Sequence, residues 1–130
     1  MKLQLVNTKI LNVSLKRLEK KDTKRKKKFG LNVGNLFNPD NPKAFAVVFK
    51  LTLDNPEYDL SVNAVHWFEA EKEISEEFKL SDFPSINAPA ISFPFLRAYV
   101  SNLTLQSGYE PAILPSLNFV EMAKKKRVKK

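Results

Sequence analysis

Residues 86–119 have the sequence INAPAISFPFLRAYVSNLTLQSGYEPAILPSLNF, and the rest of the chain is organised around them. The stretch predicts a loop, a helix over residues 93–107, a second loop and the start of another helix. Ser92 can cap the first helix, and Pro94 falls in its first turn, where no amide partner is needed. Gly108 then ends the helix with the backbone freedom of a residue just past the last turn.

The predicted helix has a wide apolar face. One stripe recurs mostly at helical spacing, and a second lies beside it. Their members are Phe93, Leu96, Val100, Leu103 and Leu105, then Phe95 and Tyr99. The following segment, residues 109–115, is an apolar loop stiffened by two prolines. Asn118 has the residue type preferred at the cap of a last helix.

The first 80 residues predict four strands separated by turns. Alternation of apolar and polar residues is clearest in the third and fourth strands, whereas the first has a polar middle that predicts a bend or bulge. Glycines at positions 30 and 34 open space on the second face of the second strand. The inward-facing sets are Leu3, Leu5, Leu11, Val13 and Leu15; Phe29, Leu31 and Val33; Phe45, Val47, Phe49, Leu51 and Leu53; and Leu60, Val62, Ala64, His66, Phe68 and Ala70.

Strands followed by helices predict an α+β fold: a four-stranded antiparallel, meander-like sheet with a long helix and a short C-terminal helix packed on one face. The 130 residues suit one domain, assigned to residues 1–123, with a basic flexible tail over residues 124–130. A strand of about 14 residues spans roughly 46 Å and a 15-residue helix only about 22 Å, so part of the apolar face needs another subunit or a ligand. We therefore expect a homo-oligomer.

The net charge of +8 comes from two runs, Lys24–Lys28 and Lys124–Lys130, which hold 11 of the 22 basic residues. The remaining 11 basic and 14 acidic residues give the body a charge of −3. The plainer interpretation is a charged hairpin tip over residues 19–28 and a frayed end to the chain. Binding to RNA, ribosomes or acidic lipid through these runs is the alternative, although Phe29 is the only aromatic residue beside them.

Catalytic patterns are nearly absent. The chain has no cysteine, and His66, its one histidine, suits a packed or hydrogen-bonded role better than that of a base or ligand. Its three glycines build no phosphate-binding loop. We therefore expect no enzyme activity, no cofactor and no metal. The start of the chain shows no signal peptide and no stretch has the length of a membrane span, so a soluble cytoplasmic protein is expected.

A set of short motifs in residues 87–119 resembles the bacterial protein-export chaperone SecB in order and spacing. The motifs are Asn87-Ala88-Pro89, Ser92-Phe93-Pro94-Phe95-Leu96-Arg97, Asn102-Leu103, Ser107-Gly108-Tyr109, Leu114-Pro115 and Asn118-Phe119. The resemblance is dense over about a quarter of the chain. It implies a holdase that assembles as a dimer of dimers, binds unfolded preproteins without ATP and passes them to the motor SecA.

The same resemblance implies a client groove between the helix-loop segment and the sheet. Seven residues are candidates for its lining, although each can instead belong to the core. They are Phe93, Tyr99, Tyr109, Ile113, Leu114, Pro115 and Phe119. Carboxylates on the outer face of the sheet are expected to contact the motor, and Glu69, Glu71 and Glu73 are the candidates here.

One departure from SecB weakens the expectation of delivery to SecA. Members of the family end in an acidic flexible tail that engages the motor, whereas this chain ends in Lys124–Lys130. Relatives similar to SecB also act as chaperones of antitoxins in toxin-antitoxin systems, and that role stays open. The salt dependence of binding distinguishes a chaperone from a protein that binds RNA or ribosomes, because contacts through lysines weaken as salt rises and apolar contacts persist.

Overall fold

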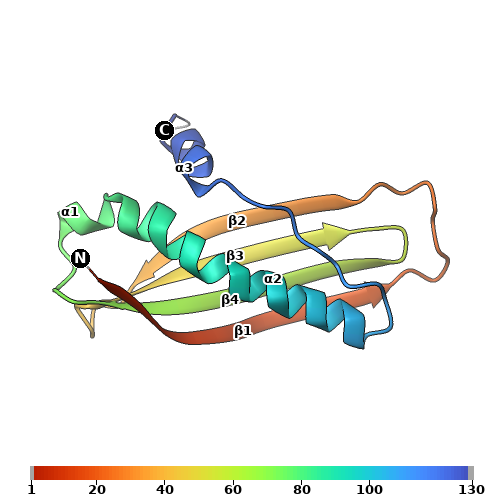
Figure 1. The fold of residues 1–130 in the computed structure, drawn as a ribbon, viewed down its shortest axis with the longest axis horizontal. Helices are drawn as coiled ribbons and strands as arrows, with labels where there is room; N and C mark the ends of the chain where they lie inside the picture. The colour runs from red at the N-terminus through yellow and green to blue at the C-terminus, as the bar shows by residue number, and fades with distance from the viewer. Residues whose placement is uncertain (1, 129–130) are drawn as a thin grey trace. The chain divides into compact units, whose positions relative to one another are not determined.

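The computed structural model describes residues 2–128, which form two compact units on either side of position 73. The first unit is an antiparallel sheet of four strands, β1 (Leu3–Arg17), β2 (Lys28–Phe37), β3 (Ala44–Asp54) and β4 (Tyr58–Ala70) (Figure 1). The second unit contains α1 (Glu76–Lys79), a π-helical turn η1 (Phe83–Asn87), α2 (Ala88–Gln106) and α3 (Phe119–Val128). The predicted α+β class and four-stranded antiparallel sheet are confirmed.

The strand order is β1-β4-β3-β2, so β2, β3 and β4 form a meander and β1 joins the sheet beside β4. This is the order of a Greek key, with β1 and β2 at opposite edges. Residues 18–27 are therefore a crossover between the two edges and not the predicted hairpin tip. The backbone N–H of Leu18 donates to Glu57 O at 2.9 Å and that of Asp22 to Pro56 O at 2.9 Å, which fastens the crossover to the β3–β4 turn.

One face of the sheet carries its largest buried side chains, as the alternation predicts. Phe45 lies opposite Phe68 and Phe49 opposite Ala64, and these residues of β3 and β4 are fully buried. The rings of Phe45 and Phe68 stack with centroids 5.4 Å apart, and Phe37 of β2 stacks on Phe45 at 6.3 Å. Burial of these large rings stabilises the sheet.

The predicted irregularity of β1 is two bulges. The register with β4 shifts between Leu5 and Asn7 and again between Ile10 and Asn12, so Val6 and Leu11 have no opposite partner. The second shift corrects one expectation, since Ile10 and not Leu11 is the half-buried residue, and Leu11 is 54% exposed. Each bulge inserts one residue and changes the side that the following residues face.

The two glycines of β2 differ on the second face of the sheet. A Cβ built on Gly34 meets no atom within 4 Å, which agrees with the predicted open space. A Cβ on Gly30 would lie 2.8 Å from Oγ1 of Thr52, its neighbour on β3. Gly30 is therefore required by a close approach, and the space beside it is already filled by Thr52.

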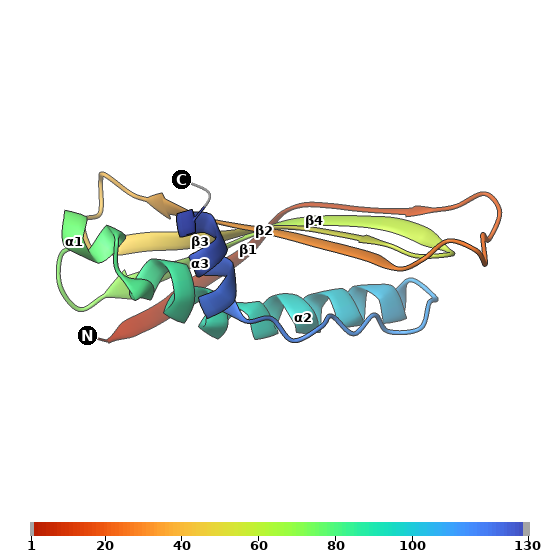
Figure 2. The same cartoon turned by 90° about the horizontal axis from the view of Figure 1, so that it is seen from above.

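Helix α2 begins earlier than the sequence predicts. Its 19 residues start at Ala88, directly after η1, with Pro89 in the first turn (Figure 2). Ser92 is not the cap: its hydroxyl is buried inside the helix and donates to Ala88 O at 2.7 Å. The chain enters α2 already wound by η1, so no side-chain cap is needed. Pro94 lies inside the helix, where it cannot donate to the carbonyl one turn earlier.

The C-terminal end of α2 is as predicted. Gly108 has φ 95°, its N–H donates to Leu105 O at 3.2 Å, and the N–H of Tyr109 donates to Thr104 O at 3.0 Å. This pair of bonds is a Schellman motif with Gly108 at the position that favours glycine. Asn118 caps α3, since its Oδ1 accepts from the Glu121 N–H at 3.1 Å.

Helix α3 extends through residue 128 and so includes residues 124–128 of the predicted tail, whose flexibility stays a prediction. Residues 129–130, the end of that tail, lie outside the described part of the chain. Within residues 2–128, no helix is both long and apolar enough to span a bilayer.

Candidate functional site

The candidate site lies within the helical unit, where residues 109–118 double back along α2 toward α3 (Figures 1 and 2). Two hydroxyls of α2 hold this segment through the backbone of Ala112. Ser101 Oγ donates to Ala112 O at 2.8 Å, and Thr104 Oγ1 accepts from the Ala112 N–H at 2.9 Å. Thr104 is fully buried, and its own hydroxyl donates to Val100 O at 2.9 Å. Both backbone groups of Ala112 are thus satisfied by the helix.

This attachment sets the directions of the next two side chains. Ile113 is 75% exposed, whereas Leu114 is only 2% exposed. Pro111 and Pro115 flank the pair and restrict the backbone on either side. The segment therefore presents an apolar side chain to solvent from a backbone that is held in place, at little further cost in conformational entropy.

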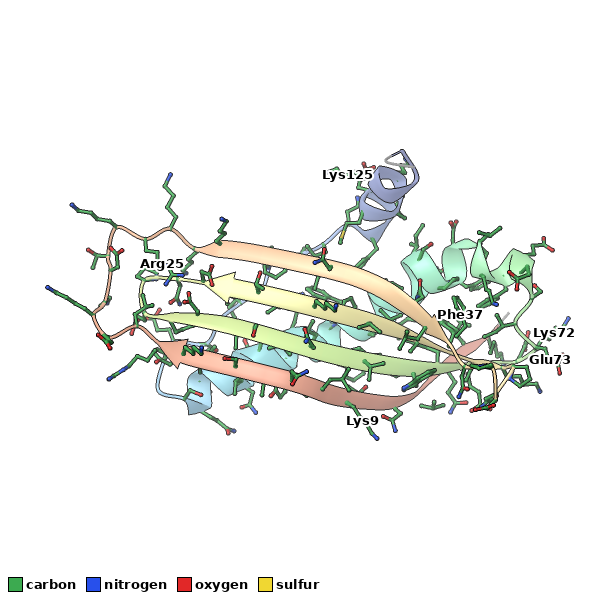
Figure 3. The ribbon with its side chains drawn as sticks, turned by 180° about the vertical axis from the view of Figure 1, so that it is seen from behind. Lys9, Arg25, Phe37, Lys72, Glu73 and Lys125 are labelled. Carbon is green, nitrogen blue, oxygen red and sulfur yellow. The ribbon has the colours of Figure 1, made fainter. Side chains whose placement is uncertain are left out.

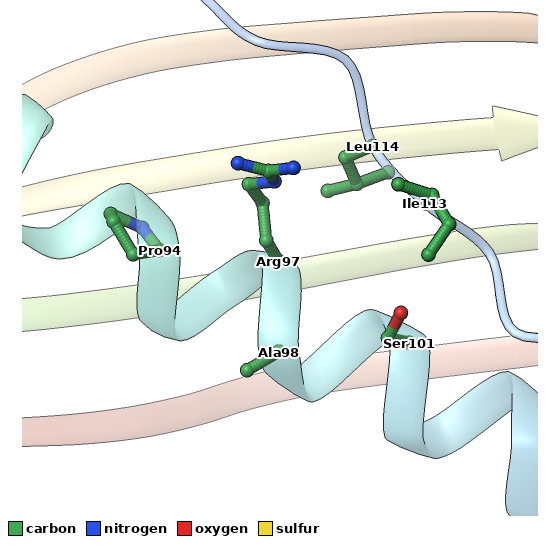
Figure 4. A pocket seen from close by; sticks show the side chains of 6 residues that line it. All are labelled: Pro94, Arg97, Ala98, Ser101, Ile113 and Leu114. Carbon is green, nitrogen blue, oxygen red and sulfur yellow. The ribbon is translucent and has the colours of Figure 1, made fainter.

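A hollow of about 230 Å³ lies between α2 and this segment (Figure 4). Pro94, Arg97, Ala98 and Ser101 of α2 line one side, and Ile113 and Leu114 line the other. The lining is mainly apolar, and its one charged residue is Arg97, which is half-buried. Its volume lies below the range of roughly 300–1,000 Å³ typical of drug-sized ligands, so it suits a single side chain of a longer molecule.

The seven predicted client residues divide into three groups. Ile113 and Leu114 line the hollow. Phe93 and Phe119 are buried and meet edge to face with centroids 5.7 Å apart, which joins α2 to α3. Tyr99 and Tyr109 are half-buried, and Pro115 is exposed. The structure thus brings two of the seven into the lining and places two others in the core of the helical unit.

Four lining residues were not singled out from the sequence as site residues: Pro94, Arg97, Ala98 and Ser101. The interruption of the apolar stripe of α2 by Ser101 and Thr104 is the signal that could have found this wall. Hydroxyls on the inner side of a helix need partners, and a nearby irregular segment offers free backbone groups.

The predicted motor-contact residues are split by the end of a strand. Glu69 is exposed on β4, opposite Gln4 of β1 and Ala44 of β3. Glu71 and Glu73 follow the strand, which ends at Ala70, so they do not continue its outer face as predicted; Figure 3 labels Glu73 beside Lys72. Only Glu69 keeps the predicted position on the sheet.

The basic runs are partly engaged within the fold. Arg25, on the crossover (Figure 3), donates to Asp59 of β4 and lies 3.6 Å from Asp54 of β3. The hydrogen bond from Arg25 is the main reason that the pKa of Asp59 lies below its ordinary value of 3.8. At the other end of the chain, Lys124 lies 3.9 Å from Glu121 in an exposed pair.

His66 is buried and packed, as expected from its place in β4. Its Nδ1 lies 3.2 Å from Thr8 Oγ1, and Phe49 meets the ring edge to face. Burial lowers its pKa below 6.5, which favours the neutral imidazole. Its Nε2 has no hydrogen-bond partner among residues 2–128. In the same part of the chain, no three acidic or histidine side chains gather in a group that could hold a metal ion.

Comparison with known proteins agrees with this architecture. The family model described as SecB, preprotein translocase subunit SecB, matches residues 22–130. The uncharacterized protein MJ0357 of Methanocaldococcus jannaschii is 30% identical over 115 residues, covering 83% of this chain and 72% of that protein.

Two solved structures share the fold. One is the SecB-like chaperone Rv1957 of Mycobacterium tuberculosis, in complex with a ChAD peptide from the antitoxin HigA1, with TM-score 0.70, 17% identity and coverage of 89% of this chain and 90% of that chain. The other is a Streptococcus agalactiae protein of unknown function, with TM-score 0.54, 12% identity and coverage of 89% and 98%. Because the family model matches well over half of its length, the chain belongs to the SecB family.

Proposed function

We propose that this protein is an ATP-independent holdase that binds apolar segments of unfolded proteins at the hollow between α2 and residues 109–118. The observation that carries the proposal is the contrast between Ile113 and Leu114. A soluble chain that fixes a backbone segment to a helix and still leaves a large aliphatic side chain 75% exposed has an apolar surface available for a ligand. Apolar burial is non-directional, so such a surface can accept many sequences.

Other exposed apolar groups in the helical unit support the same use. They are Ile91, Phe95 and Leu105 on α2 and Val120 on α3, each between 43% and 55% exposed. An extended client reaches several such groups at once, and weak contacts then add along its length. Part of this surface is also available for self-association, and we propose a homo-oligomer, a dimer of dimers, as the working form.

The client class is proposed from the family and its relatives. Unfolded preproteins suit the SecB family, and the antitoxin peptide bound by Rv1957 supports an antitoxin as a second client class. For delivery to SecA, the support from the sheet is Glu69, the one candidate motor-contact residue that keeps its predicted place on β4. A cytoplasmic location follows from this proposed role.

The test follows aggregation of a protein diluted from denaturant, read by light scattering with and without this chain. We expect the parent to suppress aggregation at both low and high salt. Ile113→Asp should weaken suppression several-fold, since a charge at the hollow has to be desolvated when a client binds. The matched control is Leu80→Asp, which alters a side chain that is 81% exposed at the end of α1 and should leave suppression unchanged.

Three results would contradict the proposal. If the parent fails to suppress aggregation, the protein is not a holdase. If Ile113→Asp and Leu80→Asp suppress aggregation as well as the parent, the hollow is not where clients bind. Suppression that disappears at high salt would instead favour contacts through the lysine runs.

A further inference from the structure

The chain between β1 and β2 concentrates the positive charge of the sheet unit. Residues 16–28, here called the basic segment, contain nine basic and two acidic residues, a net charge of +7. The rest of residues 2–73 contains five basic and seven acidic residues, a net charge of −2. Six lysines of the basic segment are exposed and form no ion pair within residues 2–73: Lys20, Lys21, Lys24, Lys26, Lys27 and Lys28.

The fold holds the basic segment in a defined conformation. Two backbone hydrogen bonds fasten it to the β3–β4 turn. Within it, Asp22 Oδ1 accepts from the Lys24 N–H at 3.1 Å and Asp22 O from the Arg25 N–H at 3.1 Å, which closes a turn. The side chain of Arg25 donates to Asp59 (Figure 3). A cationic segment whose backbone is already ordered loses little conformational entropy when it binds a partner.

The composition of the basic segment favours a nucleic-acid duplex over other polyanions. Lysine binds phosphate as a point charge, and a duplex presents phosphates at high density. Phe29, the aromatic residue next to the segment, is half-buried opposite Leu53 of β3, so it offers no platform for stacking the bases of a single strand. Stable attachment to a lipid surface needs an apolar anchor besides basic charge, and Leu18, the one apolar residue of the segment, is half-buried.

We propose that the basic segment binds the phosphate backbone of a nucleic-acid duplex without reading its base sequence. Six lysines on a fixed crossover supply the phosphate contacts, and no side chain of the segment is of the type that stacks on bases. This inference does not depend on the proposed holdase function, because the basic segment belongs to the sheet unit and the hollow to the helical unit.

The experiment measures the Kd of the full chain for short labelled duplexes by fluorescence anisotropy, over a series of salt concentrations. The probes are an RNA duplex, a second RNA duplex of scrambled sequence, and a DNA duplex of the first sequence. We expect Kd values that agree within about threefold, since the contacts are to phosphates, and affinity that falls steeply as salt rises. One strand of the RNA duplex alone should bind more weakly, because its charge density is lower.

Two double variants separate the basic segment from net charge. Lys24→Gln with Lys26→Gln should weaken duplex binding on the order of tenfold and reduce the slope of log Kd against log salt by about two, one for each lost phosphate contact. The control is Lys9→Gln with Lys50→Gln, which makes the same change of charge at exposed positions on β1 and β3 and should keep the Kd within about twofold of the parent. All four side chains are exposed, so both variants should melt as the parent does.

Several outcomes would overturn the inference. The parent would then fail to bind any duplex at low salt, or the two double variants would lose affinity equally, which would assign binding to net charge. A loss confined to Lys124→Gln with Lys125→Gln would assign it to the other basic run. Tighter binding of the single strand would indicate base stacking. Tighter binding of vesicles that contain phosphatidylserine would assign the basic segment to a lipid surface.

Discussion

Two hollows of the molecule each contain an arginine, and the surroundings of the two arginines are opposite. The hollow in the sheet unit, of about 380 Å³, includes Arg25 together with Asp54 and Asp59. The hollow in the helical unit, of about 230 Å³, includes Arg97 with apolar neighbours and no carboxylate. Arg25 is neutralised inside the fold, where it attaches the crossover to β3 and β4. Within the described part of the helical unit, residues 74–128, Arg97 forms no ion pair.

The comparison suggests how to separate scaffold from site in this fold. The size of a hollow does not decide its use, since the larger of these two is already satisfied by its own charges. What matters is whether the polar groups are paired and whether apolar groups remain exposed. By both criteria the helical hollow is the proposed binding site, and the sheet hollow is part of the scaffold.

The largest effect is expected from placing a charge on the buried wall of the helical hollow. Leu114→Asp should lower the free energy of unfolding by about 3–5 kcal/mol, because it buries an unpaired carboxylate at a position that is 2% exposed. Ile113→Asp, one residue earlier, should change it by no more than about 0.5 kcal/mol. Urea unfolding of both variants measures the difference. Similar losses in the two variants would show that the exposed wall is also structural.

A smaller effect is expected at the paired arginine of the sheet hollow. Arg25→Gln should raise the pKa of Asp59 toward 3.8, because the hydrogen bond that lowers it is lost. The lowered pKa means that the unfolded chain binds this proton more readily than the folded one. The contribution of ionised Asp59 to the stability of the fold is therefore fully present above pH 3.8. It is lost as the pH falls through the pKa of Asp59 in the folded protein. Arg25→Gln should lose less stability over that acid range than the parent.

The measurement is a side-chain carboxyl titration by NMR, with acid unfolding of the same samples. Suppression of client aggregation should stay unchanged in Arg25→Gln, since this arginine belongs to the scaffold. An unaltered pKa of Asp59 would show that the pair does not persist in solution. Loss of suppression would make the sheet hollow part of the binding site and remove the distinction between the two arginines.

The burial of residues in the sheet was predictable where apolar residues occupy every second position of a strand. Phe45, Val47 and Phe49 alternate without interruption, and their burial followed from that pattern. The position of β1 did not follow, because alternation states which face a residue occupies and not which strand it joins. A bulge in β1 was predicted but its position at Leu11 was not, since Ile10 and Leu11 are equally apolar and only the register with β4 distinguishes them.

In the helical unit, the helix ends that depend on a single residue type were predictable. Gly108 and Asn118 have local roles that few other residues fill, and both are confirmed. The predicted start of α2 was wrong. A serine can cap a helix, but it can equally lie inside one and donate its hydroxyl to a carbonyl one turn earlier, as Ser92 does. The opposite exposures of Ile113 and Leu114 depend on the bonds of Ala112 to Ser101 and Thr104, which no local pattern reveals.

The central claim is that clients lie against the hollow of the helical unit, and site-specific photocrosslinking tests it most directly. A benzophenone amino acid replaces Ile113 in one sample and Leu80 in another. Both positions are exposed and apolar, but Ile113 lines the hollow and Leu80 lies at the end of α1. Each protein is illuminated with an unfolded client at high salt, and the covalent adducts are counted on a denaturing gel. We predict strong adducts from position 113 and few from position 80. Equal yields from both positions, or no adduct from position 113, would contradict the account.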